Sequence, residues 1–157
     1  MVLDPEKRYE VRRGDSDLNT LEMARSMLRQ AASRLKTAET ALSDGNYPYS
    51  IRSSQECVEL SLKASLRLLG IEYPKKHDVS RAMLRFRERY PEWFPIERFA
   101  KTSMRLAELR EPAMYGEEES LTPPEALFTE EEARKALEEA KEVYRYVERM
   151  VKEVEGR

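Results

Sequence analysis

The sequence contains few of the residues that build disulfides, metal sites and phosphate-binding loops. Its 157 residues include one cysteine, one histidine and five glycines. The lone Cys57 excludes an internal disulfide and fits a reducing compartment. One cysteine and one histidine are too few for a structural zinc site of the usual kind, and no Gly-x-Gly-x-x-Gly or P-loop pattern is present. We therefore expect neither a metal nor a bound cofactor.

Long apolar runs and amide side chains are also scarce. No apolar run approaches the roughly 20 residues that cross a bilayer, and the first residues lack the apolar core of a signal peptide. We therefore expect a cytoplasmic protein with no membrane association. Asparagine and glutamine occur twice each, whereas 37% of the residues are charged. That combination is typical of heat-adapted proteins and favours a thermophilic source.

Charge is distributed unevenly along the chain. Residues 1–110 carry 21 basic and 16 acidic side chains, whereas residues 111–157 carry 7 basic and 14 acidic side chains. One run of basic residues comprises Arg81, Arg85, Arg87, Arg89, Arg98, Lys101 and Arg105. Such a surface can meet phosphate, or it can be the solvated face of helices. The sequence leaves both interpretations open.

Apolar residues recur every three or four positions through most of the chain, which predicts amphipathic helices. The predicted helices cover residues 17–43, 48–69, 78–90, 96 onwards and 129–154. Pro112 is expected to break the fourth helix, because proline removes a backbone donor and clashes with the preceding turn. The Thr129 and Glu132 pair predicts a capping box for the last helix. Trp93 and Phe94 are expected to plug one end of the core.

No alternating, β-branched run competes with these helices. The sequence therefore predicts an all-α fold, an up-and-down bundle of four or five helices with short connections. Residues 1–16 have no clean period and are interpreted as a charged N-terminal arm, and residues 17–157 as a single helical domain.

Polar residues along the second predicted helix form the first candidate site. They lie on one helical face: Arg52, Gln55 or Glu56, Glu59, Lys63 and Arg67. Spacings of four residues bring such side chains together on a helix. This face is either a solvated ladder of ion pairs or the lining of a groove or dimer seam. The only histidine, His77, is expected to be solvent-facing or part of a helix cap.

The fourth predicted helix carries the second candidate site. Its inward series of positions 96, 99, 103 and 106 continues to Arg110. A guanidinium away from water must be compensated, because leaving it unpaired costs several kcal/mol. Its partner is a carboxylate of Glu56 or Glu59, a water-filled cleft, a second subunit or a phosphate. Tyr115 follows shortly, and an arginine with a phenol suits an anionic or nucleotide ligand.

In their order and spacing, several short motifs resemble the HEPN domain of prokaryotes. These motifs are Gly45-Asn46-Tyr47, Gln55-x3-Glu59-x3-Lys63-Ala64, Gly70, His77-Asp78 and Arg110-x4-Tyr115-Gly116. The resemblance covers about residues 17–154. It implies a dimerising bundle, and many similar domains pair with a minimal nucleotidyltransferase as a toxin and antitoxin. Active members are metal-independent ribonucleases that use an Arg-x4-6-His motif at the dimer cleft.

By position, Arg110 matches the arginine of that motif, whereas Tyr115 stands where the histidine is expected. A histidine exchanges protons near neutral pH, and a phenol does so only at much higher pH. The leading hypothesis is therefore a homodimeric HEPN-like module with weak or no catalysis. It would bind a nucleotide, RNA or a nucleotidyltransferase partner through Arg110, Tyr115 and the polar face with His77. The alternatives are a ribonuclease toxin that uses Arg110 and Tyr115, and a structural helical adaptor.

Overall fold

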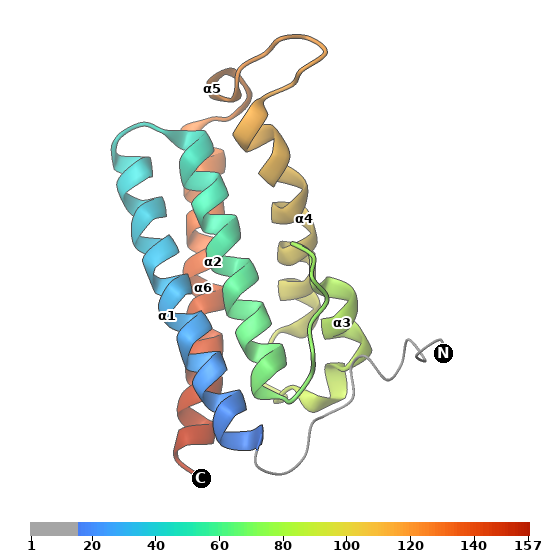
Figure 1. Ribbon diagram of the computed structural model, residues 1–157. Coiled ribbons are helices and arrows are strands. Elements are labelled where there is room, and N and C mark those ends of the chain that lie inside the picture. Colours follow the sequence, from blue (N-terminus) through green and yellow to red (C-terminus); the bar gives the residue numbers. More distant parts are fainter. Residues whose placement is uncertain (1–15) are drawn as a thin grey trace.

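Four long helices, each antiparallel to the long helix before it, form the body of the computed structural model, which describes residues 16–157 (Figure 1). They are α1 (Ser16–Ser43), α2 (Tyr47–Leu68), α4 (Ile96–Tyr115) and α6 (Glu130–Glu155). No β-strand is present between residues 16 and 157, apart from an isolated bridge between Glu117 and Thr122. The predicted all-α up-and-down bundle is therefore confirmed. The charged arm predicted for residues 1–16 lies almost wholly outside the described residues.

Helix α2 lies at the centre of the bundle, in contact with α1, α4 and α6. Its apolar stripe is fully buried at Ile51, Leu62 and Leu66. Burying one such side chain contributes about 1.5–3 kcal/mol, so the stripe accounts for much of the packing that α2 directs towards its neighbours. Helix α2 also carries polar residues. They lie beside α1 and α4, because these two helices flank α2.

Local sequence signals set the ends of these helices. The Asn46 side chain accepts a hydrogen bond from the Tyr49 backbone N–H at 3.3 Å and caps α2. Thr129 and Glu132 form the predicted capping box at the start of α6. Both caps satisfy backbone donors that have no partner inside the helix. The turn chemistry read from the sequence therefore matches the observed boundaries.

The prediction that Pro112 breaks the fourth helix is wrong. Helix α4 continues through Pro112 and ends at Tyr115, where the Gly116 N–H donates to the Pro112 carbonyl at 2.8 Å. Proline costs the helix one hydrogen bond. The turn beyond it stays helical because Ala113 is buried, with 6% of its surface exposed. Packing of that turn outweighs the single missing donor.

The region between α2 and α4 is less regular than predicted. The expected helix from Asp78 to Tyr90 is divided into α3 (Ser80–Arg85) and a 3-10 turn (Arg87–Arg89), because Phe86 leaves the helical conformation with φ −107° and ψ 27°. A short helix that the sequence did not predict, α5 (Pro124–Leu127), precedes α6. In the part of the chain that the structure describes, no helix combines the length and apolar character of a membrane span.

An aromatic cluster closes the end of the bundle near the start of α4, as predicted. Phe94 and Phe99 pack edge to face with centroids 5.2 Å apart, and both rings meet Tyr146 on α6. Trp93 covers the same cluster, and the Arg149 guanidinium lies 3.8 Å from the centroid of its ring. These rings fasten α4 to α6 at one end of the bundle.

Candidate functional site

Arg110 reaches from α4 onto the polar face of α2. Its Nη1 atom donates to Gln55 Oε1 at 2.9 Å and to Glu56 Oε1 at 3.1 Å. The Arg110 side chain is 22% exposed. The expectation that this guanidinium needs a compensating group is therefore met, and Glu56 is the one of its two predicted carboxylate partners that it contacts.

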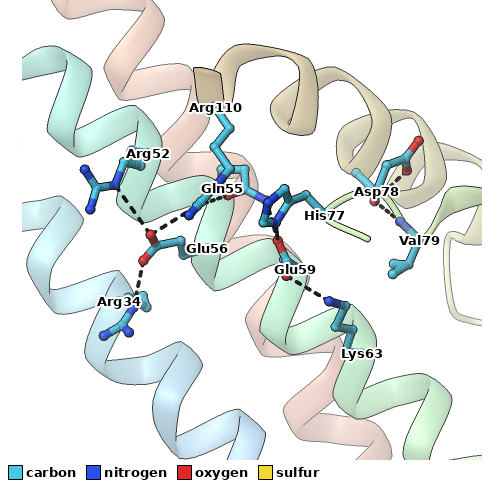
Figure 2. A network of polar contacts seen from close by, with 11 residues as sticks. Arg34, Arg52, Gln55, Glu56, Glu59, Lys63, His77, Asp78, Val79 and Arg110 are labelled. Carbon is cyan, nitrogen blue, oxygen red and sulfur yellow. Dashed lines mark hydrogen bonds and ion pairs between the residues drawn. The ribbon is translucent and has the colours of Figure 1, made fainter. Parts of the chain in front are cut away.

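Glu56 is approached by three guanidiniums from three helices (Figure 2). Arg34 on α1 lies 2.7 Å from Glu56 Oε2, and Arg52 on α2 lies 3.5 Å from Glu56 Oε1. Arg110 completes the group, which we call the arginine cluster: Arg34, Arg52 and Arg110 around Glu56. Three positive charges thus converge on one negative charge. Arg34 and Arg52 keep 43% and 34% of their side chains exposed, so the cluster is open to solvent.

Gln55 links this cluster to a second carboxylate. The Gln55 side chain is 1% exposed, and its Nε2 atom donates to Glu59 Oε1 at 2.9 Å while its Oε1 atom accepts from Arg110. A buried amide with both ends bonded fixes the positions of its partners, because leaving either end unpaired would cost about 1–3 kcal/mol. Arg110 and Glu59 are therefore held in one connected network.

Glu59 is surrounded by donors. Lys63 Nζ lies 2.9 Å from its Oε2 atom, and His77 Nδ1 lies 2.7 Å from its Oε1 atom. Burial by itself raises the pKa of the Glu59 carboxyl, but hydrogen bonds from Lys63, Gln55 and His77 outweigh it and lower that pKa below its ordinary value. Glu59 is therefore an ionised anchor for the linker that carries His77. The His77 side chain is 58% exposed, as expected, and also pairs with Glu59.

Helical spacing explains much of this arrangement. Arg52, Glu56, Glu59 and Lys63 are three or four residues apart on α2, so they share a face. Two ion pairs are present along this face, Arg52 with Glu56 and Lys63 with Glu59, but Glu59 and Lys63 are only 15% and 12% exposed. The last member, Arg67, lies with Lys63 over the ring of Tyr73. The part of this face from Glu59 to Arg67 is thus covered by the linker after α2, whereas Arg52 stays partly exposed.

Arg34 is a member that the sequence analysis did not identify. It lies on α1 between Ala31 and Leu35 of the apolar stripe, but α1 also carries Arg25 and Arg29. Only the rotation of α1 against α2 distinguishes Arg34 from those two, and no local pattern encodes that rotation.

Tyr115 does not share the face of Arg110. Both lie on the continuous helix α4, where five residues correspond to a rotation of about 500°, or about 140° around the axis. The Tyr115 side chain lies in the last turn and is 59% exposed. The structure thus brings Arg110 together with Arg52, Gln55, Glu59, Lys63 and His77 in one network, and leaves Tyr115 outside it.

The family model of the HEPN domain matches residues 24–150. The chain belongs to the HEPN family. The matched region begins in α1, ends in α6 and includes every side chain of the arginine cluster. No curated protein and no solved structure matches the chain. The properties of this HEPN domain therefore have to be inferred from its own residues.

The potential metal ligands and the thiol of this HEPN domain can be placed for residues 16–157. Among residues 16–157, no three His, Cys, Asp or Glu side chains gather in a way that could hold a metal ion. Cys57 is fully buried, and this burial raises the pKa of its thiol to about 12. The thiol of Cys57 is therefore neutral at neutral pH.

Replacing Glu59 by glutamine is expected to lower the free energy of unfolding by about 1–2 kcal/mol at neutral pH, the scale of a hydrogen-bonded charge. Because folding lowers the pKa of Glu59, this stabilisation is present above the ordinary carboxyl pKa and is lost as the pH falls through the folded-state value. Urea denaturation of the wild type and the variant should therefore give free energies of unfolding whose difference becomes smaller below about pH 4.

The control is Glu119→Gln, a change at an exposed carboxylate in the loop after α4. It should leave the free energy of unfolding nearly unchanged at every pH. A Glu59→Gln difference that is the same at neutral and acidic pH would contradict the ionised role of Glu59.

Proposed function

We propose that this HEPN domain binds the phosphate of a nucleotide or RNA through the arginine cluster, Arg34, Arg52 and Arg110, with weak or no catalysis. The observation that supports it is the convergence of three partly exposed guanidiniums on the single carboxylate of Glu56. Membership of the HEPN family supports a function related to nucleotides or RNA. The main activity proposed for the protein is thus binding of a nucleotide or RNA, not catalysis.

Guanidinium groups are well suited to phosphate. Each presents five N–H donors in a planar fork, and two parallel hydrogen bonds to phosphate oxygens add both energy and orientation. The side chains of Arg34, Arg52 and Arg110 remain 43%, 34% and 22% exposed beside Glu56. A phosphate can therefore approach from solvent while Glu56 remains in place, and Glu56 competes with it for the same positive charge.

Weak catalysis is part of the proposal because Tyr115 replaces the expected histidine. Proton transfer at neutral pH needs a group that gains and loses a proton there. The exposed phenol of Tyr115 suits hydrogen bonding to a ligand or stacking on a base. Its place in the last turn of α4, away from the face of Arg110, also separates it from the arginine cluster.

The proposal includes the homodimer and the nucleotidyltransferase partner that the resemblance to prokaryotic HEPN domains implies, in a toxin–antitoxin pair. Light scattering of the purified protein would test the dimer. Co-purification with a nucleotidyltransferase encoded beside it would test the partner. A monomer at every concentration would remove the dimer from the proposal.

Two substitutions at the cluster are expected to change binding in opposite directions. Arg110→Gln should weaken the binding of a fluorescent oligoribonucleotide about tenfold or more, because a hydrogen bond to a charged phosphate is lost. Glu56→Gln should tighten it about fivefold, because a competing negative charge is removed. Fluorescence anisotropy measures both, with circular dichroism to confirm that the variants are folded.

The matched control is Arg145→Gln, at an exposed arginine of α6. It removes the same charge away from the cluster and should leave the affinity close to that of the wild type. Equal affinities for all four proteins would overturn the proposed site. Incubation of RNA with each protein and a chelator tests the ribonuclease alternative, since cleavage that is lost in Arg110→Gln would show an enzyme.

A further inference from the structure

A basic hollow lies where the linker after α2 enters α3, next to the residue that contacts Glu59 of the polar network. Its volume is about 690 Å³, and its lining includes Pro74, Lys76, Asp78, Arg81, Leu84 and Arg85. Three of these side chains are basic and one is acidic. Pro74 and Leu84 add apolar surface between the charges, so the hollow offers both kinds of contact that a nucleotide unit uses.

The single carboxylate of the hollow is already engaged by the protein. Asp78 Oδ1 accepts hydrogen bonds from the Ser80 N–H at 2.9 Å and from Ser103 Oγ at 3.0 Å. By contrast, the side chains of Lys76 and Arg81 are exposed and form no ion pair with any residue between 16 and 157. Asp78 therefore forms no ion pair with Lys76 or Arg81, and its negative charge remains in the lining beside them.

Four other basic residues of the 81–105 run have partners within the fold. Three of them pair with glutamates: Arg87 with Glu97, Arg98 with Glu142 and Arg105 with Glu139. Arg89 instead lies over the ring of Phe86. The sequence left open whether this run meets phosphate or is a solvated surface, and the answer differs from one residue to the next. Arg87, Arg98 and Arg105 belong to ion pairs at the surface, whereas Lys76 and Arg81 at the hollow form no ion pair within residues 16–157.

The hollow and the Arg110 network meet at two adjacent residues. Lys76 lines the hollow, and His77 contacts Glu59 of the network. The Cα atoms of Lys76 and His77 are about 3.8 Å apart, because the two residues are consecutive. The following residues are fixed to α4, because the Val79 N–H donates to Ser103 Oγ at 3.0 Å. Figure 2 shows His77 between Glu59 and Asp78. The linker therefore joins the hollow to Glu59, which Gln55 connects to Arg110.

We propose that the hollow binds backbone phosphates of the same single-stranded RNA that places a phosphate at the arginine cluster. This inference rests on the proposed function and names its ligand class, an RNA strand of several nucleotides rather than a free mononucleotide. Lys76 and Arg81 hold phosphates, and Pro74 and Leu84 contact the sugar or base between them. His77 lies at the point where the strand passes from one region to the other.

The test compares the double variant Lys76→Ala/Arg81→Ala with the wild type and with Lys135→Ala/Arg145→Ala. The control pair removes the same charges from exposed positions of α6. Each protein is titrated by fluorescence anisotropy with a single-stranded oligoribonucleotide of about ten nucleotides and with fluorescent AMP, at several salt concentrations. Circular dichroism confirms that all three proteins keep their helices.

The hollow variant is expected to bind the oligoribonucleotide about tenfold or more weakly, since each lost charge contributes roughly fivefold. Its plot of log affinity against log salt should be shallower by about 0.7 for each lost phosphate contact. AMP should bind it as it binds the wild type, and the control pair should match the wild type with both ligands.

Three results would overturn the inference. The first is a hollow variant whose oligoribonucleotide affinity and salt slope equal those of the control pair, while Arg110→Gln still weakens binding. This result would leave the proposed function intact. The second is an equal loss of AMP and oligoribonucleotide affinity in the hollow variant, which indicates a general effect of charge. The third is a wild type that binds neither ligand, which removes the proposed function as well.

Discussion

Replacing Phe99 by alanine is expected to lower the free energy of unfolding by about 3–5 kcal/mol, the range for truncating a buried phenylalanine. The Phe99 ring is 1% exposed and packs edge to face against Phe94 and Tyr146, with centroids 5.2 Å and 5.3 Å away. Such ring pairs contribute beyond the area that they bury. Because Tyr146 belongs to α6 and Phe99 to α4, the cavity would open at the junction of these helices.

Urea denaturation followed by far-UV circular dichroism measures this loss. Phe99→Leu is the control, because it keeps an apolar side chain in the site and should cost much less, about 1–2 kcal/mol. A loss below about 1 kcal/mol for Phe99→Ala would show that the aromatic cluster does not hold α4 against α6.

Replacing Gly116 by alanine is expected to cost about 3 kcal/mol or more, and to disturb the loop between α4 and α5. A Cβ atom at this position would lie 2.1 Å from the Thr122 carbonyl oxygen, a backbone atom. Gly116 also has φ 72° and ψ −154°, a conformation that residues with a side chain rarely adopt. The bridge between Glu117 and Thr122 would have to open to relieve the contact.

Gly45 provides a matched control for this substitution. It also has a positive φ, 77°, but a Cβ atom there would meet nothing within 4 Å. Gly45→Ala should therefore cost only the backbone strain, about 1–2 kcal/mol. Thermal unfolding of both variants separates the two contributions. Equal losses would mean that the Thr122 carbonyl moves away easily and that the contact at Gly116 is unimportant.

Much of the fold could be predicted from local sequence patterns. The periodicity of apolar residues located α1, α2 and α6 to within about two residues, because each presents one apolar stripe to the core. The same reasoning singled out Arg110, since a charged residue on such a stripe needs a partner. Of the two carboxylates considered, Glu56 is the one that contacts Arg110 directly, and Glu59 is linked to it through Gln55.

The remainder depends on contacts between segments that are distant in sequence. Arg34 joins the arginine cluster only because α1 packs against α2 in one rotation, and His77 meets Glu59 only because the linker folds back along α2. The helix survives Pro112 because Ala113 is buried beyond it. None of these outcomes has a local signature. Sequence patterns predict which face of a helix is buried, whereas the packing angle decides which side chains meet.

The aromatic cluster gives the protein an internal fluorescence reporter at a defined position. Trp93 is the only tryptophan in the chain, so selectively excited emission comes from the corner where residues 90–96 meet α6. The ring is covered by the Arg149 guanidinium and lies near Tyr146, and detachment of that corner would change its surroundings. Comparing this emission with the helical signal therefore distinguishes loosening of one end from melting of the whole bundle.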